Sequence, residues 1–267
     1  MRTRLRYYLT SIPTLLWGVR NWPTVIAGLS GLPAASPVVV TLRDGLRFRV
    51  KTPLDLWILK ETCLDRQYER AGVPLEDGWI ILDIGAALGD FAIGAASRYP
   101  RSQVYAYEPF PASFALLQEN LRLNRIQNVR AFPYALGAQA GTASLRLISP
   151  EAVQHTTTPD GNAREILQVP GTTLDEVFAE LRLSHCDYVK MDCEGAEYDI
   201  LFHASEATVR KVRHFCLEYH DGVTDFSHHD LVRYFEARGF RVRLTPNPVH
   251  RQLGYLYAEN EELKIKS

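Results

Sequence analysis

From residue 78 onward, short apolar runs rich in β-forming residues alternate with stretches whose apolar residues recur at helical spacing. This alternation predicts right-handed βαβ units and a mostly parallel sheet with helices on both faces. The predicted strands are 79–83, 103–107, 129–133, 188–191 and 215–219. The predicted helices are 90–99, 111–124, 173–183 and 227–238, and the last two begin with N-terminal capping patterns.

Two further β-like runs follow the last helix, at 240–244 and 254–258, and they predict an antiparallel edge to this sheet. Residues 149–165 lie between core elements and show no periodicity. A loop of that length is usually functional or mobile, and a lid over a site is one interpretation.

A different pattern precedes residue 76. Two β-rich runs within 38–50 flank Asp44-Gly45, which predicts a hairpin with a two-residue type I′ turn. An apolar face recurs from Pro53 to about Glu69 and predicts one continuous helix. We therefore divide the chain into an N-terminal arm, hairpin and helix at 1–75 and an α/β domain at 76–267.

Composition narrows the function classes. With 46% hydrophobic and 23% charged residues, the chain of 267 residues is globular in type, not fibrous or disordered. A formal charge of -1 gives no overall attraction to nucleic acid, so we expect no nucleic-acid partner. The four cysteines form no C-x-x-C pair, which indicates reduced thiols and a cytoplasmic protein.

The charge is uneven, because residues 1–43 contain five arginines and no acidic residue. The apolar run at 14–32 is interrupted by Arg20, Asn21 and Pro23, so we expect no transmembrane helix. Residues 1–43 are instead either a helical arm packed on the protein or on a partner subunit, or a peripheral contact to an anionic membrane.

A glycine loop joins the first predicted strand of the α/β domain to its helix. Its pattern is Asp83-x-Gly85-x-x-x-Gly89, and Glu108 ends the next strand 23 residues after Gly85. A carboxylate at that distance is typical of nucleotide folds in which it accepts hydrogen bonds from both ribose hydroxyls. The apolar faces of Pro109 and Phe110 are candidates to lie against an adenine.

Two features of this loop favour S-adenosylmethionine over a dinucleotide. Ala87 stands where a second close glycine would be, and the carboxylate of Asp90 in the first helical turn would repel a pyrophosphate. S-adenosylmethionine has no phosphate and carries an ammonium group and a sulfonium, with which nearby acids are compatible.

Acidic residues also end two other predicted strands. Lys190, Asp192 and Glu194 recur at period two, and Glu218 and His220 repeat the feature on the next strand. Three interpretations remain open: general-base chemistry, with orientation of a substrate hydroxyl or of the cofactor's ammonium group; a divalent-metal site; and a buried ion-pair network around Lys190 or arginines. The histidines expected on the surface or in packing are His155, His203, His214, His228 and His229.

These blocks resemble the FkbM family of S-adenosylmethionine-dependent methyltransferases. The matching segments are LDIGAALGDFAI, VYAYEPFPASFALLQENLRLNRIQNV, TTLDEV, YVKMDCEGAEYDIL and LEYH, and the lead-in DLWILKETCLDRQYE is similar as well. The resemblance implies a class I methyltransferase fold, with a seven-stranded sheet that is antiparallel at one edge. Family members mostly methylate hydroxyl groups of polyketides or sugars, and some relatives methylate nitrogen. The family commonly has Asn where this chain has Ala87.

We therefore expect an S-adenosylmethionine-dependent methyltransferase of secondary metabolism that acts on a hydroxyl of a sugar, polyketide, lipid or related metabolite, with no metal. The alternatives are an N-methyltransferase of the same fold, a nicotinamide-dependent oxidoreductase, and a methyltransferase-like binding protein without turnover. The candidate catalytic residues are Asp192, His220 and Glu218, with His220 as a base that is neutral at neutral pH. The candidate cofactor-binding residues are Asp83, Gly85, Ala86, Gly89, Asp90, Phe91, Glu108, Pro109, Phe110, Ala135, Asp192 and Glu194.

Overall fold

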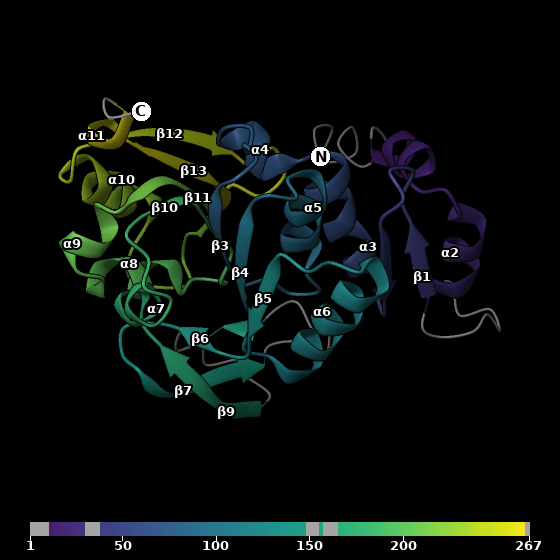
Figure 1. Ribbon diagram of the computed structural model, residues 1–267, viewed down its shortest axis with the longest axis horizontal. Coiled ribbons are helices and arrows are strands. Elements are labelled where there is room, and N and C mark those ends of the chain that lie inside the picture. Colours follow the sequence, from purple (N-terminus) through teal and green to yellow (C-terminus); the bar gives the residue numbers. More distant parts are fainter. Residues whose placement is uncertain (1–10, 30–37, 148–154, 157–164, 265–267) are drawn as a thin grey trace.

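A seven-stranded sheet in the order β12-β13-β11-β10-β3-β4-β5 forms the centre of the computed structural model, which describes residues 11–29, 38–147, 155–156 and 165–264 (Figure 1). Its strands are β3 (Ile80–Ile84), β4 (Gln103–Tyr107), β5 (Val129–Phe132), β10 (Cys186–Met191), β11 (Val212–His220), β12 (Phe240–Pro246) and β13 (Leu253–Asn260). β13 is antiparallel to β11 and β12, and the other neighbours are parallel. The predicted fold class is confirmed, with β13 one strand in from the edge.

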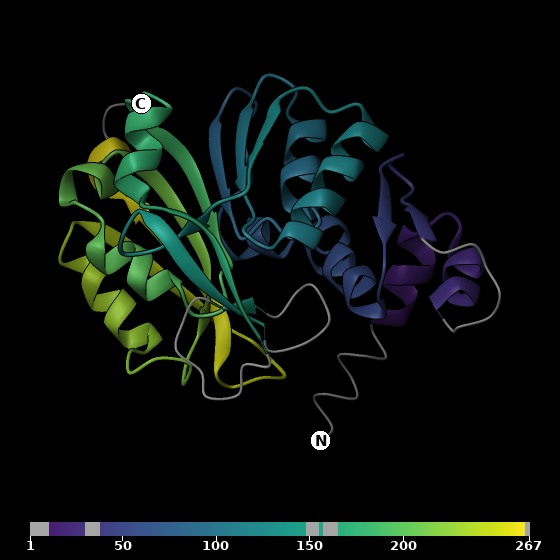
Figure 2. The ribbon, with the colours of Figure 1, turned by 90° about the horizontal axis from the view of Figure 1, so that it is seen from below.

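Helices cover both faces of this sheet (Figures 1 and 2). Alternate residues of each strand face opposite layers, so Ile81 packs with α4, α5 and α6, whereas Leu82 packs with α7, α8 and α10. The helices are α4 (Gln67–Ala71), α5 (Asp90–Arg98), α6 (Pro111–Asn124), α7 (Leu174–Glu180), α8 (Glu197–His203) and α10 (His228–Glu236), with the short α9 (Glu206–Val209) and α11 (Glu261–Lys264).

Both predicted caps form. Ser227 and Asp230 make a reciprocal capping box at the start of α10. The Thr173 side chain accepts a hydrogen bond from the Glu176 N–H at 3.2 Å at the start of α7. These side chains satisfy backbone donors that the first helical turn leaves unpaired, which is why the predicted starts are correct within one residue.

The hairpin predicted in the N-terminal part is present, but its turn is different. Strands β1 (Val38–Thr41) and β2 (Arg47–Val50) pair in antiparallel register. The Leu42 N–H donates to the Leu46 carbonyl, so the loop has three residues instead of two. Gly45 has φ 97°, whereas Asp44 does not have the positive φ that a type I′ turn requires. The predicted turn type is therefore wrong.

The arm packs on this hairpin. It consists of helical residues 11–18 and α2 (Trp22–Leu29), and its Val19 and Val25 are buried with the hairpin side chains. The Asn21 side chain accepts from the Thr41 N–H and donates to the Val39 carbonyl. The interpretation as a packed helical arm is therefore confirmed for residues 11–29. No helix in the described part of the chain is long and apolar enough to cross a membrane.

The single helix predicted from Pro53 to Glu69 is wrong. The chain forms α3 (Pro53–Leu59), the π-helix η1 (Lys60–Leu64) and then α4. Lys60 is buried and its Nζ lies 2.7 Å from Asp65 Oδ2, and Arg66 adopts a left-handed conformation with φ 52°. A π-turn widens the helix and re-aims the residues that follow, which apolar periodicity does not encode.

The chain between β5 and α7 forms a second, four-stranded sheet that the sequence analysis did not predict. Its order is β6-β9-β7-β8, formed by β6 (Ala135–Leu136), β7 (Gly141–Leu147), β8 (His155–Thr156) and β9 (Glu165–Thr172). The loop predicted at 149–165 is thus interrupted by β8 and ends where β9 begins. The rest of it lies outside the described residues, so the lid stays a prediction.

Candidate active site

A cavity of about 950 Å³ lies at the carboxyl ends of β3, β4, β10 and β11. Its walls include α3 and η1 on one side, the start of the second sheet on another, and the β12–β13 connection. Ligands of open α/β sheets bind outside the carboxyl ends of the strands, so the cavity is where the topology predicts a site.

The glycine loop passes close beneath this cavity. Gly85 has φ 79°, and a Cβ there would lie 1.9 Å from the Asp192 carbonyl oxygen, so only glycine fits between the two strand ends. Lys190 Nζ donates to the Gly85 carbonyl at 2.7 Å and lies 3.0 Å from Asp83 Oδ1. The ion-pair interpretation therefore applies to Lys190, whose partner is Asp83, and this buried pair supports the loop.

Glu108 is buried at the end of β4 and lines the cavity. Its carboxylate accepts hydrogen bonds from the Ala87 N–H at 2.8 Å and the Phe110 N–H at 2.9 Å. Burial raises the pKa of Glu108 to about 7, against the opposing effect of these hydrogen bonds. Ala87 adopts φ 46°, a conformation that L-residues rarely take, and in it the Ala87 N–H reaches Glu108.

The predicted cofactor-binding residues fall into two groups. Those that line the cavity are Gly85, Asp90, Glu108, Pro109, Ala135, Asp192 and Glu194. The others do not line it and are packed around it: Asp83 and Ala86 are buried, Gly89 is the N-cap of α5, Phe91 stacks on Tyr188, and Phe110 packs against the second sheet.

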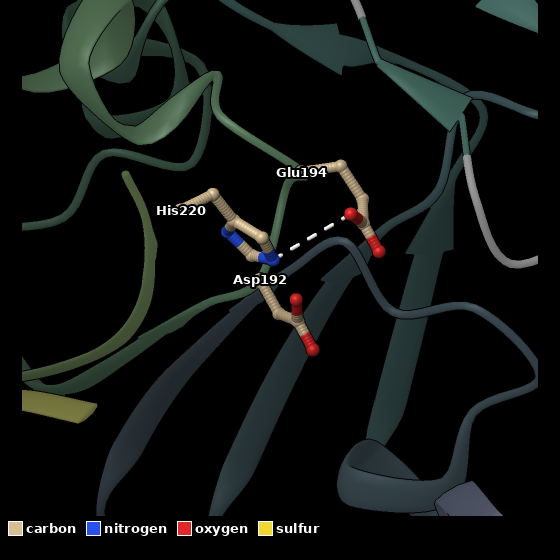
Figure 3. Close-up of side chains that lie close together, drawn as sticks. All are labelled: Asp192, Glu194 and His220. Carbon is tan, nitrogen blue, oxygen red and sulfur yellow. Dashed lines mark ion pairs between the residues drawn. The ribbon is translucent and has the colours of Figure 1, made fainter. Parts of the chain in front are cut away.

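Asp192, Glu194 and His220 converge in this cavity (Figure 3). One carboxylate oxygen of each acid and one ring nitrogen of His220 all lie within 4.8 Å of one another. His220 Nε2 is 3.5 Å from Glu194 Oε2. Glu218, on the same strand as His220, lines the same cavity. The predicted meeting of acids from β10 and β11 is therefore present, because the parallel pairing of these strands brings their carboxyl ends together.

A further glutamate holds this loop in place. The fully buried Glu197 accepts hydrogen bonds from the Cys193 N–H at 2.7 Å and the Gly195 N–H at 2.9 Å. Between them Glu194 has φ 52°, and its side chain lines the cavity. Sequence reasoning did not single out Glu197, although its spacing of three residues from Glu194 in D-C-E-G-A-E is the signal that was available.

Tyr68 is the second residue that the sequence did not reveal. It lies on α4, and its hydroxyl donates to Asp192 Oδ2 at 2.7 Å. The break at η1 separates α4 from α3, and Glu61 and Thr62 of η1 line the cavity together with Tyr68. The sequence pattern predicted a continuous helix through Tyr68 and gave no sign of the break at η1. Both the wrong helix prediction and the missed contact of Tyr68 with Asp192 follow from that.

The acids set the protonation of the cluster. Burial disfavours the charged imidazolium of His220, but Glu197, Glu194 and Asp192 outweigh it and raise the pKa of His220 well above its usual value. The direction of this shift is opposite to the expectation that His220 is neutral at neutral pH. Burial raises the pKa of Glu194 to about 7, and burial with the charge of Asp192 raises the pKa of Glu218 well above its usual value.

The other histidines have structural contacts where their side chains are described. His214 is buried and stacks on Trp79 and Tyr257, which confirms its packing role. His228 Nδ1 lies 2.6 Å from Asp221 Oδ2. His203 and His229 are at or near the surface, whereas the side chain of His155 lies outside the described set.

The comparisons with known proteins agree with this geometry. The family model "Methyltransferase FkbM domain" matches residues 83–242. The 31-O-demethyl-FK506 methyltransferase FkbM of Streptomyces tacrolimicus is 26% identical over 222 residues, which covers 72% of this chain and 84% of that protein. The 2-O-methyltransferase NoeI of Sinorhizobium fredii (strain NBRC 101917 / NGR234) is 26% identical over 166 residues, 53% of this chain and 63% of that protein.

Among solved structures, the Methyltransferase FkbM of Methylobacillus flagellatus KT superposes with a TM-score of 0.51 at 16% sequence identity. The match covers 76% of this chain and 53% of that chain, so this chain matches about half the length of that protein. At this identity the likeness concerns the fold alone.

Proposed function

Because this chain belongs to the FkbM family of S-adenosylmethionine-dependent methyltransferases, we propose that it methylates a hydroxyl oxygen of a small-molecule or glycan acceptor. Family membership makes the chain an enzyme and removes the oxidoreductase alternative. The names of the two relatives both specify a methylated oxygen, which supports oxygen over nitrogen. A sugar, polyketide, lipid or related metabolite remains the proposed acceptor class.

The residues at the loop fit the cofactor. Glu108 is a buried carboxylate facing the cavity with backbone N–H groups as its hydrogen-bond donors, and it retains acceptor capacity for the two hydroxyls of a ribose. Asp90 and Asp192 offer carboxylates to an ammonium group. When bound, S-adenosylmethionine supplies an electrophilic methyl group on a sulfonium. A pyrophosphate at this loop would meet the carboxylates of Asp90, Glu108 and Asp192, and the cation Lys190 is already paired with Asp83, which disfavours a dinucleotide.

The observation that carries the oxygen proposal is the cluster of acids with His220 at the carboxyl ends of β10 and β11. Its acids are Asp192, Glu194 and Glu218. A hydroxyl must lose its proton as it attacks, so a group of matching pKa has to lie nearby. The pKa of Glu194, about 7, is matched to that task at neutral pH. We assign proton acceptance to this cluster, with Asp192 and Glu218 orienting the hydroxyl and protonated His220 holding Glu194 in position through their 3.5 Å contact.

The test is transfer of a labelled methyl group to an acceptor in a cell extract. The protein is incubated with the extract and ¹³C-methyl S-adenosylmethionine, and the labelled product is isolated. The carbon chemical shift of the methyl group then distinguishes attachment to oxygen from attachment to nitrogen. A Glu108→Ala variant serves as the control and should give little label. A methyl group on nitrogen would overturn the oxygen proposal and leave the cofactor assignment in place.

A further inference from the structure

The N-terminal arm exposes an unusual number of large apolar side chains. Among the described residues, eight large hydrophobic side chains are exposed, and five of them lie on helical residues 11–18 and α2. We call these five the arm face: Ile12, Leu16, Trp17, Trp22 and Ile26. Trp17 is 79% exposed and Ile26 is 53% exposed. Single exposed hydrophobic residues need no explanation, but a concentration of them marks an interaction surface.

The arm face is distinct from the side of the arm that packs on the protein. Val19 and Val25 are buried against the hairpin, so the arm already has an apolar contact of its own. Ile12 and Leu16 are four residues apart in one helix, as are Trp22 and Ile26 in the other, so each pair lies on one side of its helix. The arm face is therefore additional apolar surface.

The charge of the N-terminal segment indicates which partner covers the arm face. Residues 1–43 contain five arginines and no acidic residue, and the Arg43 guanidinium lies 5.8 Å from the centre of the Trp17 ring. Exposed tryptophan and isoleucine in a segment that is rich in arginine and free of acids is the composition of segments that bind the interface of an anionic bilayer. A symmetric contact between two copies would bring the exposed like charges of Arg20 and Arg43 from both copies into one interface, which disfavours self-association.

We propose that the arm face docks on an anionic lipid bilayer, with its apolar side chains entering the interface and its arginines contacting lipid phosphates. The arm lies at one end of the molecule in both views, away from α7, α8 and α10 (Figures 1 and 2). The β1–β2 hairpin stands between the arm and α3 in the chain, and Leu54, Trp57 and Ile58 of α3 line the cavity. Docking does not depend on which acceptor the enzyme methylates.

The test is co-sedimentation of the full-length protein with vesicles. Vesicles of phosphatidylcholine alone are compared with vesicles that also contain phosphatidylglycerol, at low and high salt. We expect binding that requires phosphatidylglycerol and falls as salt rises. Trp17→Glu and Ile26→Glu should each weaken vesicle binding about tenfold or more. Each replaces an apolar side chain that would enter the bilayer interface with a negative charge that the anionic bilayer repels.

A matched control is available on the second sheet. Ile166 is 51% exposed, nearly as much as Ile26, and lies on β9 outside the arm. Ile166→Glu should leave vesicle binding unchanged, and binding of S-adenosylhomocysteine verifies that every variant is folded. Absence of vesicle binding at low salt, or an equal loss in Ile166→Glu, overturns the proposal. So does a dimer in light scattering that Ile26→Glu dissociates without any vesicle binding.

Discussion

Glu108 shows how one buried side chain can couple cofactor binding to pH. Its pKa is raised to about 7 because burial penalises the carboxylate. The charged form is the better acceptor for two hydroxyls, so affinity for S-adenosylhomocysteine should rise as the pH passes through about 7 and then level off. Glu108→Ala should weaken binding by about 2–4 kcal/mol at pH 8, since two charge-assisted hydrogen bonds are lost.

Isothermal titration calorimetry of wild type and variant between pH 6 and pH 8 measures both effects. Glu108→Gln keeps the shape and removes the charge, so it should bind weakly and lose the part of the pH dependence that comes from Glu108. An unchanged dissociation constant in a folded Glu108→Ala variant would remove Glu108 from the cofactor site.

The acid cluster gives a second prediction at this scale. Glu194 must be ionised to accept a proton, so turnover should rise with pH through about 7. It should decline again only at a pH above the usual histidine range, where His220 loses its proton, because the neighbouring acids raise the pKa of His220. His220→Ala should lower turnover by about 10²–10⁴ with little change in cofactor affinity. Asp192→Asn should lower turnover by a similar factor and also weaken cofactor binding, because we assign Asp192 to the ammonium group as well.

Steady-state kinetics with the acceptor found in the extract measures this profile, and Glu194→Gln should abolish its acidic limb. A divalent metal on the same three residues is the competing explanation. It predicts that a chelator stops turnover and that Mg²⁺ or Mn²⁺ restores it, whereas we expect no effect of chelation. The proton-acceptor assignment fails if Asp192→Asn and His220→Ala both retain wild-type turnover.

At the scale of elements, the glycine loop and β10 constrain each other. A Cβ on Gly85 would overlap the Asp192 carbonyl oxygen, and both residues line the cavity. Gly85→Ala should therefore separate the two strand ends, lower stability and abolish detectable binding of S-adenosylhomocysteine. Gly78 is the matched control, because its φ of 96° is also positive but no atom lies within 4 Å of its Cβ position.

Gly78→Ala should cost only the conformational strain of about 1–2 kcal/mol and leave binding intact. Thermal unfolding and calorimetry on the two variants separate backbone strain from overlap. Equal losses of stability and binding in both would mean that the approach of β3 to β10 does not matter.

Elements that depend on local sequence pattern could be predicted, whereas elements that depend on tertiary contacts could not. Strands β3, β4 and β10 coincide with β-rich runs in the sequence, and the starts of α7 and α10 carry caps, so their approximate bounds follow from local pattern. The second sheet was missed because its strands β7 and β9 pair across segment 148–164, and pairing over that distance leaves no local signal. The π-turn η1 depends on the buried Lys60–Asp65 contact, which periodicity cannot report.

The same distinction applies to the site. Glu108 and Asp192 follow strands directly, so the topology of a parallel sheet places them at its active edge. Tyr68 reaches Asp192 from a helix 124 residues earlier in the chain, a contact that only the folded chain creates. His220 was located correctly, yet its protonation depends on Glu197, whose orientation is set by two backbone N–H groups.

At the scale of the whole molecule, the boundary proposed at 75/76 crosses a shared core. Tyr68, Ala71 and Leu75 are buried with Trp79 and Tyr188 in one cluster, and the hairpin is buried with α6 in another. An N-terminal unit that unfolds separately would need its own core. We therefore expect residues 38–264 to unfold in a single transition.

Asn120 offers the point at which this expectation can be tested. It is fully buried on α6, accepts from the Arg49 N–H at 2.7 Å and donates to the Leu88 carbonyl at 3.0 Å, so it joins the hairpin to the glycine loop. Asn124 makes the corresponding bonds to Arg47 at a more exposed position.

Asn120→Ala leaves buried backbone groups without partners, which should cost about 2–4 kcal/mol and lower the melting temperature by about 5–12 °C. Asn124→Ala should cost less than about 1 kcal/mol, because water replaces its bonds. In scanning calorimetry the whole transition should move as one peak in Asn120→Ala, with equal calorimetric and van't Hoff enthalpies. A split into two peaks, with only the smaller one displaced, would show instead that the N-terminal part is a separate folding unit and that the boundary at 75/76 is a true domain boundary.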